Sequence, residues 1–253
     1  MIDLHFHLLP GIDDGAVDWA TARRLATQAA EDGCSAVIAT PHQRHPAWDD
    51  RQPSELAALL EQLQAAATRA PASKDLALHL GAEIRVRADL LEDLERPDLG
   101  GLLPLAGSRY LLLEFERAAR PEVEPYSLLH ELTLAGWRPI IAHPEFVPWL
   151  AEDIAQARRL AERGALFQIT ALCLLGEVSR SAAVFCRQMV EQGLAHFVAS
   201  DAHSPVIRPP GLSRAYRMVA KTWSEDLANT LFRDNPAAVL ANRALPVTQE
   251  SLP

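Results

Sequence analysis

Histidines and carboxylates recur in this 253-residue sequence directly after short apolar runs. His5 and His7 come first, two residues apart in one apolar segment. If that segment is a strand, both side chains lie on one face, because strand side chains alternate. The further members of the set are His42, Glu83, Glu114, His143, Asp201 and His203, with Asp13 and Asp14 in a glycine-flanked loop after the first segment.

Imidazole and carboxylate groups together are the ligands that zinc, manganese and iron accept in proteins, and no thiolate joins this set. The ligands exceed what one ion requires, so we expect two or three ions with bridging carboxylates. Such a cluster lowers the pKa of a bound water and clamps the oxygens of a displaced group, which suits phosphate-ester hydrolysis. A single His-x-His pair or one glutamate after a strand is more often structural. The recurrence after successive apolar runs indicates a metal cluster.

The apolar runs alternate with helical patterns along the chain. Each run is short, rich in Ile, Val, Leu or Phe and followed by a polar or proline-bearing break, which is typical of buried parallel strands. The predicted strands cover residues 2–7, 36–40, 76–82, 110–115, 139–143, 166–170 and 196–200. Seven strand-plus-helix units predict an α/β fold, a distorted TIM-like (β/α)7 barrel, whose functional groups collect at the carboxyl ends of the strands. A doubly wound open sheet is the alternative.

Apolar residues spaced by three and four predict helices between these strands. Asp18 is expected to cap the first helix, and Gly33 follows its predicted end. A second helix carries an apolar stripe from Leu56 to Ala67. Further helices are predicted at roughly 86–96, 125–135, 150–163, 179–192, 211–221 and 224–233.

Composition limits the possible functions. A net charge of -9 argues against a general nucleic-acid binder, which needs a basic surface to neutralise phosphates. Three widely spaced cysteines indicate reduced thiols rather than a disulfide framework. No apolar run reaches the roughly 20 residues of a membrane span, and no signal peptide is evident, so we expect a soluble, cytoplasmic protein. We expect a single domain over 1–253, with a loosely held tail at 244–253; the sequence predicts no oligomeric state.

The ordered motifs resemble the polymerase-and-histidinol-phosphatase (PHP) superfamily. More narrowly, they resemble the bacterial metal-dependent protein-tyrosine phosphatases of capsule and exopolysaccharide synthesis. The resemblance runs from the first residue to about Arg243. It is carried by the segments IDLHFHLLPGIDDG (2–15), ATPH (39–42), GAE (81–83), LLEF (112–115), AHPE (142–145), FQIT (167–170), ASDAH (199–203) and RPP (208–210).

The resemblance implies a site for three divalent metals, with manganese most common and iron or zinc as alternatives. One ion would bind His5, His7, Glu83 and Asp201; a second Glu83, Glu114 and His143; the third Asp14, His42 and His203, with Asp13 as a substitute for Asp14. It also implies catalytic roles for Asp201, His203 and Arg208. The expected reaction is attack of a metal-bridging hydroxide on phosphotyrosine, carried by the tail of a tyrosine kinase that controls polysaccharide export.

One position departs from the family pattern. The family usually has an arginine after His-Pro-Glu that helps to hold the phosphate, and here that position is Phe146. An apolar ring cannot replace a planar bidentate donor. Arg208 matches the second arginine of the family, and Arg44 is expected to reach the site from a neighbouring loop. The segment Glu116-Arg117-Ala118 also departs from the family, which tends to have a proline there.

The sequence also bears on three other functions. A cysteine-dependent phosphatase is excluded, because the residues six beyond Cys34, Cys173 and Cys186 are Thr40, Ser179 and Gln192, not the arginine of a Cys-x5-Arg loop. A small-molecule phosphatase of the histidinol-phosphatase type is the alternative enzyme. A non-catalytic protein that binds the kinase tail is the alternative outside the enzymes, although burying so many ionisable groups is costly without metals.

Overall fold

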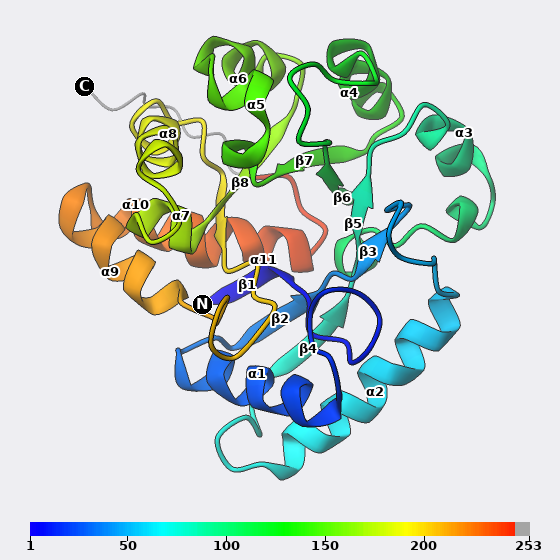
Figure 1. Ribbon diagram of the computed structural model, residues 1–253, viewed down its shortest axis with the longest axis vertical. Coiled ribbons are helices and arrows are strands. Elements are labelled where there is room, and N and C mark those ends of the chain that lie inside the picture. Colours follow the sequence, from blue (N-terminus) through cyan, green and yellow to red (C-terminus); the bar gives the residue numbers. More distant parts are fainter. Residues whose placement is uncertain (246–253) are drawn as a thin grey trace.

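The protein, described here by a computed structural model over residues 1–245, is a ring of parallel strands surrounded by helices (Figure 1). The predicted tail at 244–253 lies mostly outside the described residues. The strands are β1 (Ile2–Phe6), β2 (Ala36–Ala39), β3 (His42–Gln43), β4 (Ala77–Leu80), β5 (Glu83–Arg85), β6 (Tyr110–Glu114), β7 (Arg138–Ala142), β8 (Leu166–Thr170) and β9 (Phe197–Ala199).

Two of the seven predicted strands are interrupted and continue beyond the break. β2 and β3 are separated by Thr40 and Pro41, and β4 and β5 by Gly81 and Ala82. The first halves, β2 and β4, join β1 in the sheet β1-β2-β4. The second halves, β3 and β5, join the sheet β3-β5-β6-β7-β8-β9. A parallel bridge between Phe6 and Ala202 joins the end of β1 to the segment after β9. The seven strand positions thus close into the predicted (β/α)7 barrel, and the open-sheet alternative is wrong.

The helices fill the intervals between strands. They are α1 (Trp19–Glu31), α2 (Pro53–Arg69), α3 (Leu90–Glu95), α4 (Pro125–Leu134), α5 (Pro148–Ala151), α6 (Ile154–Ala161), α7 (Ala171–Leu175), α8 (Arg180–Glu191), α9 (Leu212–Thr222), α10 (Glu225–Asn229) and α11 (Asn235–Leu240). Asp18 caps α1 as predicted, since its side chain accepts a hydrogen bond of 2.7 Å from the Thr21 N–H. Among residues 1–245, no helix is long and apolar enough to cross a bilayer.

Three helix predictions were wrong in extent. Only Leu90–Glu95 of the segment 86–96 is helical, because Val86 continues the strand by donating its N–H to Glu114. The segment 150–163 is divided between α5 and α6, and Asp153 caps the second piece. The segment 224–233 begins as α10 and passes through a π-helical turn into α11.

The core is divided by the wall of the barrel. Alternate side chains of β6 and β7, such as Leu112 and Ile140, join a small inner cluster with Leu4, and the other side chains pack against the helices. In β1 the register shifts between Asp3 and Phe6, and Phe6 packs in the outer cluster. This irregularity breaks the simple alternation at the point where β1 carries its histidines.

Candidate metal centre

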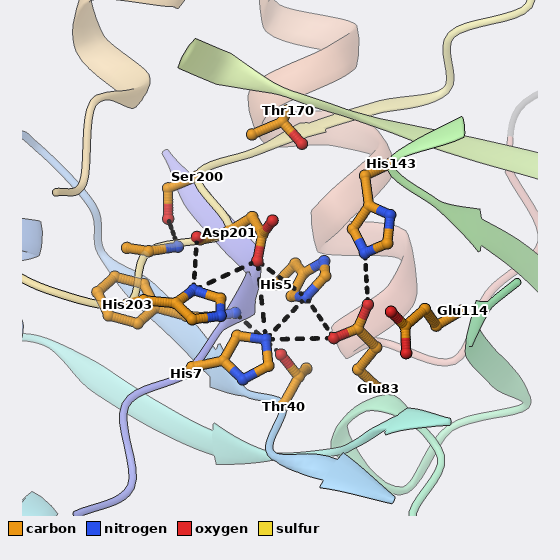
Figure 2. Close-up of polar contacts among 12 residues, drawn as sticks. His5, His7, Thr40, Glu83, Glu114, His143, Thr170, Ser200, Asp201 and His203 are labelled. Atoms are coloured by element: carbon orange, nitrogen blue, oxygen red, sulfur yellow. Dashed lines mark hydrogen bonds and ion pairs between the residues drawn. The ribbon is translucent and has the colours of Figure 1, made fainter. Parts of the chain in front are cut away.

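The predicted ligands gather at one end of the barrel. Figure 2 shows most of them, with Glu83 facing His5, His7 and His143. His5 lies in β1 and His7 follows it, while Glu114 ends β6 and His143 follows β7. His42 and Glu83 begin the second halves β3 and β5, where they are paired in register. Asp201 and His203 follow β9, and Asp14 comes from the loop after β1. The structure therefore brings all nine side chains into one cluster.

Glu83 lies at the centre of the cluster and is almost fully buried. Its Oε1 atom is 2.6 Å from His143 Nε2, and its Oε2 atom is 3.2 Å from His7 Nε2 and 3.3 Å from His5 Nε2. His42 Nδ1 lies 3.1 Å from the same Oε2. Four imidazoles thus surround one carboxylate, which is the geometry of a bridging ligand.

Asp14 marks the more open side of the cluster. Its Oδ1 atom is 3.4 Å from His42 Nε2 and 3.3 Å from His203 Nε2, and its side chain is partly exposed. The ligand atoms form four overlapping groups: His7, Asp14, His42 and His203; His5, His143 and Asp201; His5, His7 and Glu83; and His42, Glu83 and Glu114. The residues are those that the resemblance implies, but their grouping differs from the three sets expected. His5, His7 and His42 each belong to two groups, and His143 groups with His5 and Asp201.

Outer hydrogen bonds orient the histidines. Asp13 Oδ2 is 2.8 Å from His7 Nδ1, and Gln168 Oε1 is 2.8 Å from His5 Nδ1. These acceptors hold the Nδ1 proton and leave Nε2 as the ligand atom, which is the usual arrangement around metal-bound histidines. Asp13, which the sequence left open as a substitute for Asp14, contacts the outer nitrogen of His7, whereas Asp14 faces the cluster.

Two residues of the set have left-handed backbone conformations. The φ angle is 31° at His143 and 52° at Asp201, a region that residues other than glycine rarely adopt. The Asp201 N–H donates to the His5 carbonyl oxygen at 3.0 Å, which ties this turn to β1. Such strain is concentrated at functional sites, where it aims a side chain that relaxed backbone would turn away.

The donor set fits divalent cations. His5 Nε2 and His7 Nε2 lie 3.2 Å apart, and within residues 1–245 Glu114 Oε2 and His143 Nδ1 are buried without a hydrogen-bond partner. Burial favours the neutral form of Glu83, yet His5 and His143 outweigh it and hold the pKa of Glu83 well below its usual value. Burial lowers the pKa of His143, but Glu83 outweighs this effect and raises it to about 9. Strong attraction for positive charge is therefore concentrated at this point.

Gly15 is required by the packing against His7. A Cβ atom at this position would lie 2.3 Å from the His7 carbonyl oxygen and 2.4 Å from its Cβ. We expect Gly15→Ala to displace His7 and to lower manganese affinity by about 10- to 100-fold, the effect typical of disturbed metal-ligand support. Titration of the purified variant with manganese measures this, with Gly211→Ala as the control, where the added Cβ meets only ordinary contact at 3.7 Å. Unchanged affinity in Gly15→Ala would contradict the expectation.

A cavity of about 320 Å³ opens above the cluster and is rich in arginine. Arg208, to which the resemblance implies a catalytic role, lines this cavity and forms an ion pair with Asp201. Arg85 and Arg117 also line this cavity, and Arg85 Nη1 is 3.2 Å from Glu114 Oε1. Neither residue was predicted from the sequence to lie at the site. Arg85 could have been found, since it lies two residues beyond Glu83 on the same strand.

Neither Arg44 nor Phe146 lines the ligand cavity. The Arg44 guanidinium forms ion pairs with Asp89 and Asp93, and the structure does not bring it to the cavity above the cluster. Phe146 borders a second cavity of about 650 Å³, whose apolar wall also includes Leu172, Val178, Val206, Ile207 and Pro209. Arg117 and Arg208 line both cavities, so the two are neighbours. His45 stacks on His42 and lines the first cavity.

The family described as capsular polysaccharide synthesis, CpsB/CapC, matches residues 1–241 of this chain. The chain belongs to the CpsB/CapC family. It is 33% identical to the tyrosine-protein phosphatase YwqE of Bacillus subtilis, over 97% of this chain and 93% of that protein. It is 29% identical to the tyrosine-protein phosphatase CpsB of Streptococcus pneumoniae, over 97% of this chain and all of that protein.

Solved structures agree with this membership. A chain from the crystal structures of YwqE from Bacillus subtilis and CpsB from Streptococcus pneumoniae, described as unique metal-dependent tyrosine phosphatases, matches with a TM-score of 0.88. The two chains are 32% identical, and the match covers 97% of this chain and 96% of the other. The lactonase Lmo2620 from Listeria monocytogenes, at 11% identity and a TM-score of 0.54, shares the fold alone.

Proposed function

We propose that this chain is a metal-dependent protein-tyrosine phosphatase that acts on the phosphotyrosine tail of a kinase controlling polysaccharide export. The observation that carries the proposal is the cluster of nine ligands, all but Asp14 buried or partly buried, below an arginine-lined cavity. Histidine and carboxylate ligands suit phosphoryl transfer by two or more divalent ions. The tyrosine-protein phosphatases to which the chain is similar support the choice of phosphotyrosine.

We assign the site three ions, with manganese as the working metal. Glu83 would be shared between ions, because its two oxygen atoms face different histidines. Cys34, Cys173 and Cys186 are buried and lie outside the ligand groups, so the set contains only nitrogen and oxygen donors. Such a donor set accepts manganese, iron or zinc, and the number of ligands exceeds the needs of one ion.

The side chains around the ions have separable tasks. Divalent ions held there would lower the pKa of a water molecule and neutralise charge on the phosphoryl oxygens. The guanidinium of Arg208 lines the cavity and is held by Asp201, so it is positioned to donate to a phosphate oxygen. His203 Nδ1 donates to the main-chain carbonyl oxygen of Asp201 at 2.9 Å, which directs Nε2 towards Asp14. We therefore assign Asp201, His203 and Arg208 to the reaction centre.

The second cavity favours an aryl ester over a small polar ester. It adjoins the ligand cavity at Arg117 and Arg208 and offers an apolar wall. An aromatic ring attached to a phosphate at the cluster can lie against this wall and lose its contact with water, which stabilises binding. A polar alcohol phosphate gains nothing from an apolar surface.

The proposal is tested by assaying the manganese-loaded protein on two substrates side by side. One is a phosphotyrosine peptide from a kinase tail and the other is histidinol phosphate, with His5→Ala as the blank. We expect kcat/KM to be higher for the peptide by at least about tenfold, a modest share of what burial of an aromatic ring contributes. Preference for histidinol phosphate would favour the small-molecule phosphatase, and metal binding without turnover of either would favour a binding protein.

A further inference from the structure

Arg117 differs from the other arginines of the ligand cavity. Arg208 is paired with Asp201 and Arg85 with Glu114, so carboxylates already neutralise much of their charge. Within residues 1–245, Arg117 forms no ion pair, although it lies on the exposed loop after β6 and lines the cavity. Its guanidinium carbon instead lies 4.8 Å from the centroid of the Phe146 ring.

The contact with Phe146 positions the Arg117 guanidinium and leaves its N–H groups free to donate hydrogen bonds. A guanidinium over an aromatic face is attracted by the ring, while its N–H groups remain at the edges. Phe146 is itself fixed relative to the metal ligands, since its ring centroid is 5.8 Å from that of His143. The preceding residue, Glu145, is buried and accepts the Thr170 N–H at 2.7 Å. Phe146 therefore offers an aromatic face beside the cluster, on which the Arg117 guanidinium packs.

Arg117 also lies where the two cavities adjoin. It lines both the cavity above the ligands and the adjoining apolar cavity, and Arg208 is the other residue that lines both. A phosphate at the cluster with its ring in the apolar cavity would therefore have its ester bond near both arginines. A phosphate monoester carries nearly two negative charges, and a guanidinium with no carboxylate partner is the stronger partner for it.

We propose that Arg117 donates hydrogen bonds to the phosphate of the bound monoester, with Phe146 as the residue that positions it. This assignment rests on the proposed function, because it takes the substrate to be an aryl phosphate. It gives Phe146 a defined role at the position where the resemblance implies an arginine. The positive charge near the phosphate would come from Arg117, in the loop after β6, and not from an arginine at position 146, in the turn after β7.

The assignment is tested by comparing Arg117→Ala with Arg120→Ala in the manganese-loaded protein. Arg120 is an exposed arginine of the same loop that lines neither cavity. We expect Arg117→Ala to lower kcat/KM for a phosphotyrosine peptide by about 10- to 100-fold, the range for loss of a hydrogen bond to a charged group. Its affinity for inorganic phosphate, measured by titration calorimetry, should fall by a similar factor. Arg120→Ala should leave both values unchanged.

Two further variants separate binding from a merely structural role. Phe146→Leu keeps the apolar bulk and removes the aromatic face, so we expect KM to rise while kcat is nearly retained. Adding Phe146→Arg to Arg117→Ala should restore a large part of the phosphate affinity, because an arginine next to His143 can reach the same cavity. Failure of this double variant to recover phosphate affinity, with metal content intact, would count against the assignment.

The phosphate titration distinguishes failure of this assignment from failure of the proposed function. If the wild-type protein hydrolyses the peptide and Arg117→Ala binds phosphate as well as Arg120→Ala does, the assignment of Arg117 is overturned and the proposed function stands. If the wild-type protein hydrolyses no ester but Arg117→Ala still loses phosphate affinity, the assignment stands and the proposed function fails.

Discussion

Glu83→Gln is expected to abolish phosphatase activity and to reduce the manganese content of the purified protein. The substitution keeps the size of the side chain but replaces one carboxylate oxygen by an amide nitrogen, which cannot bind a metal or accept from an imidazole. Glu83 faces His5, His7, His42 and His143, so a single change disturbs two ion positions at once. We expect kcat to fall by more than about 100-fold, the upper range for residues that only support ligands. Steady-state kinetics and elemental analysis measure the two effects.

Glu61→Gln is the matched control for this experiment. Glu61 is an exposed residue of α2 and lies outside the ligand groups, so the same chemical change should leave activity and metal content unaltered. Glu83→Gln protein that retained full metal content and turnover would show that the ions do not share this carboxylate. The bridging role of Glu83 would then be wrong, although the other ligands could still bind metal.

The barrel and the ligand cluster were largely predictable because both follow from local patterns. Parallel strands buried on both sides are short apolar runs, and their carboxyl ends meet at one edge of a barrel. His143 directly after 139–142 and Asp201 after 196–200 could therefore be assigned to the site from their positions alone. Their left-handed backbone conformations could not be predicted, because those depend on contacts such as that of Asp201 with β1.

The interruptions of two strands depend on pairing between distant segments. Thr40 and Pro41 were expected to end the second strand, yet pairing resumes at His42 because Glu83 lies opposite it. Pro41 has no N–H group to donate within a sheet, and the Thr40 hydroxyl oxygen instead accepts the Phe6 N–H at 2.9 Å. The pairing of His42 with Glu83 cannot be predicted from the sequence of either segment alone.

The positions of the arginine side chains that could contact the substrate also could not be predicted from the sequence. Arg44 follows His42 closely in sequence, and proximity along the chain suggested proximity to the site. Asp89 and Asp93, from the next strand-plus-helix unit, hold its guanidinium elsewhere. Arg117 lines the cavity, and its guanidinium lies over the ring of Phe146, which is far from it in the sequence. Long flexible side chains take their positions from such partners, so their roles follow from the fold and not from spacing.

Removal of the metals is expected to destabilise the protein, and more strongly at pH 8.5 than at pH 6.5. In the metal-free protein, Glu83 outweighs burial and raises the pKa of His143 to about 9, above the unfolded value near 6.5. A raised pKa stabilises the folded state fully below pH 6.5, and this contribution is lost as the pH rises towards 9. The loss between pH 6.5 and 8.5 is about 2 kcal/mol for this pair. At pH values above the raised pKa, His143 has lost its proton, while the carboxylates of the metal-free cluster keep their negative charge.

Bound metals respond to pH in the opposite direction, because they compete with the same proton for the Nε2 lone pair of His143. We expect EDTA treatment to lower the melting temperature by about 10 °C at pH 8.5, the effect of a ligand at roughly a thousand times its dissociation constant on a chain of this size. The decrease at pH 6.5 should be clearly smaller, and added manganese should reverse both. Differential scanning calorimetry of treated and manganese-loaded samples at the two pH values measures this. An equal decrease at both pH values would mean that the proton on His143 does not compete with the metals, and that this imidazole is not a ligand.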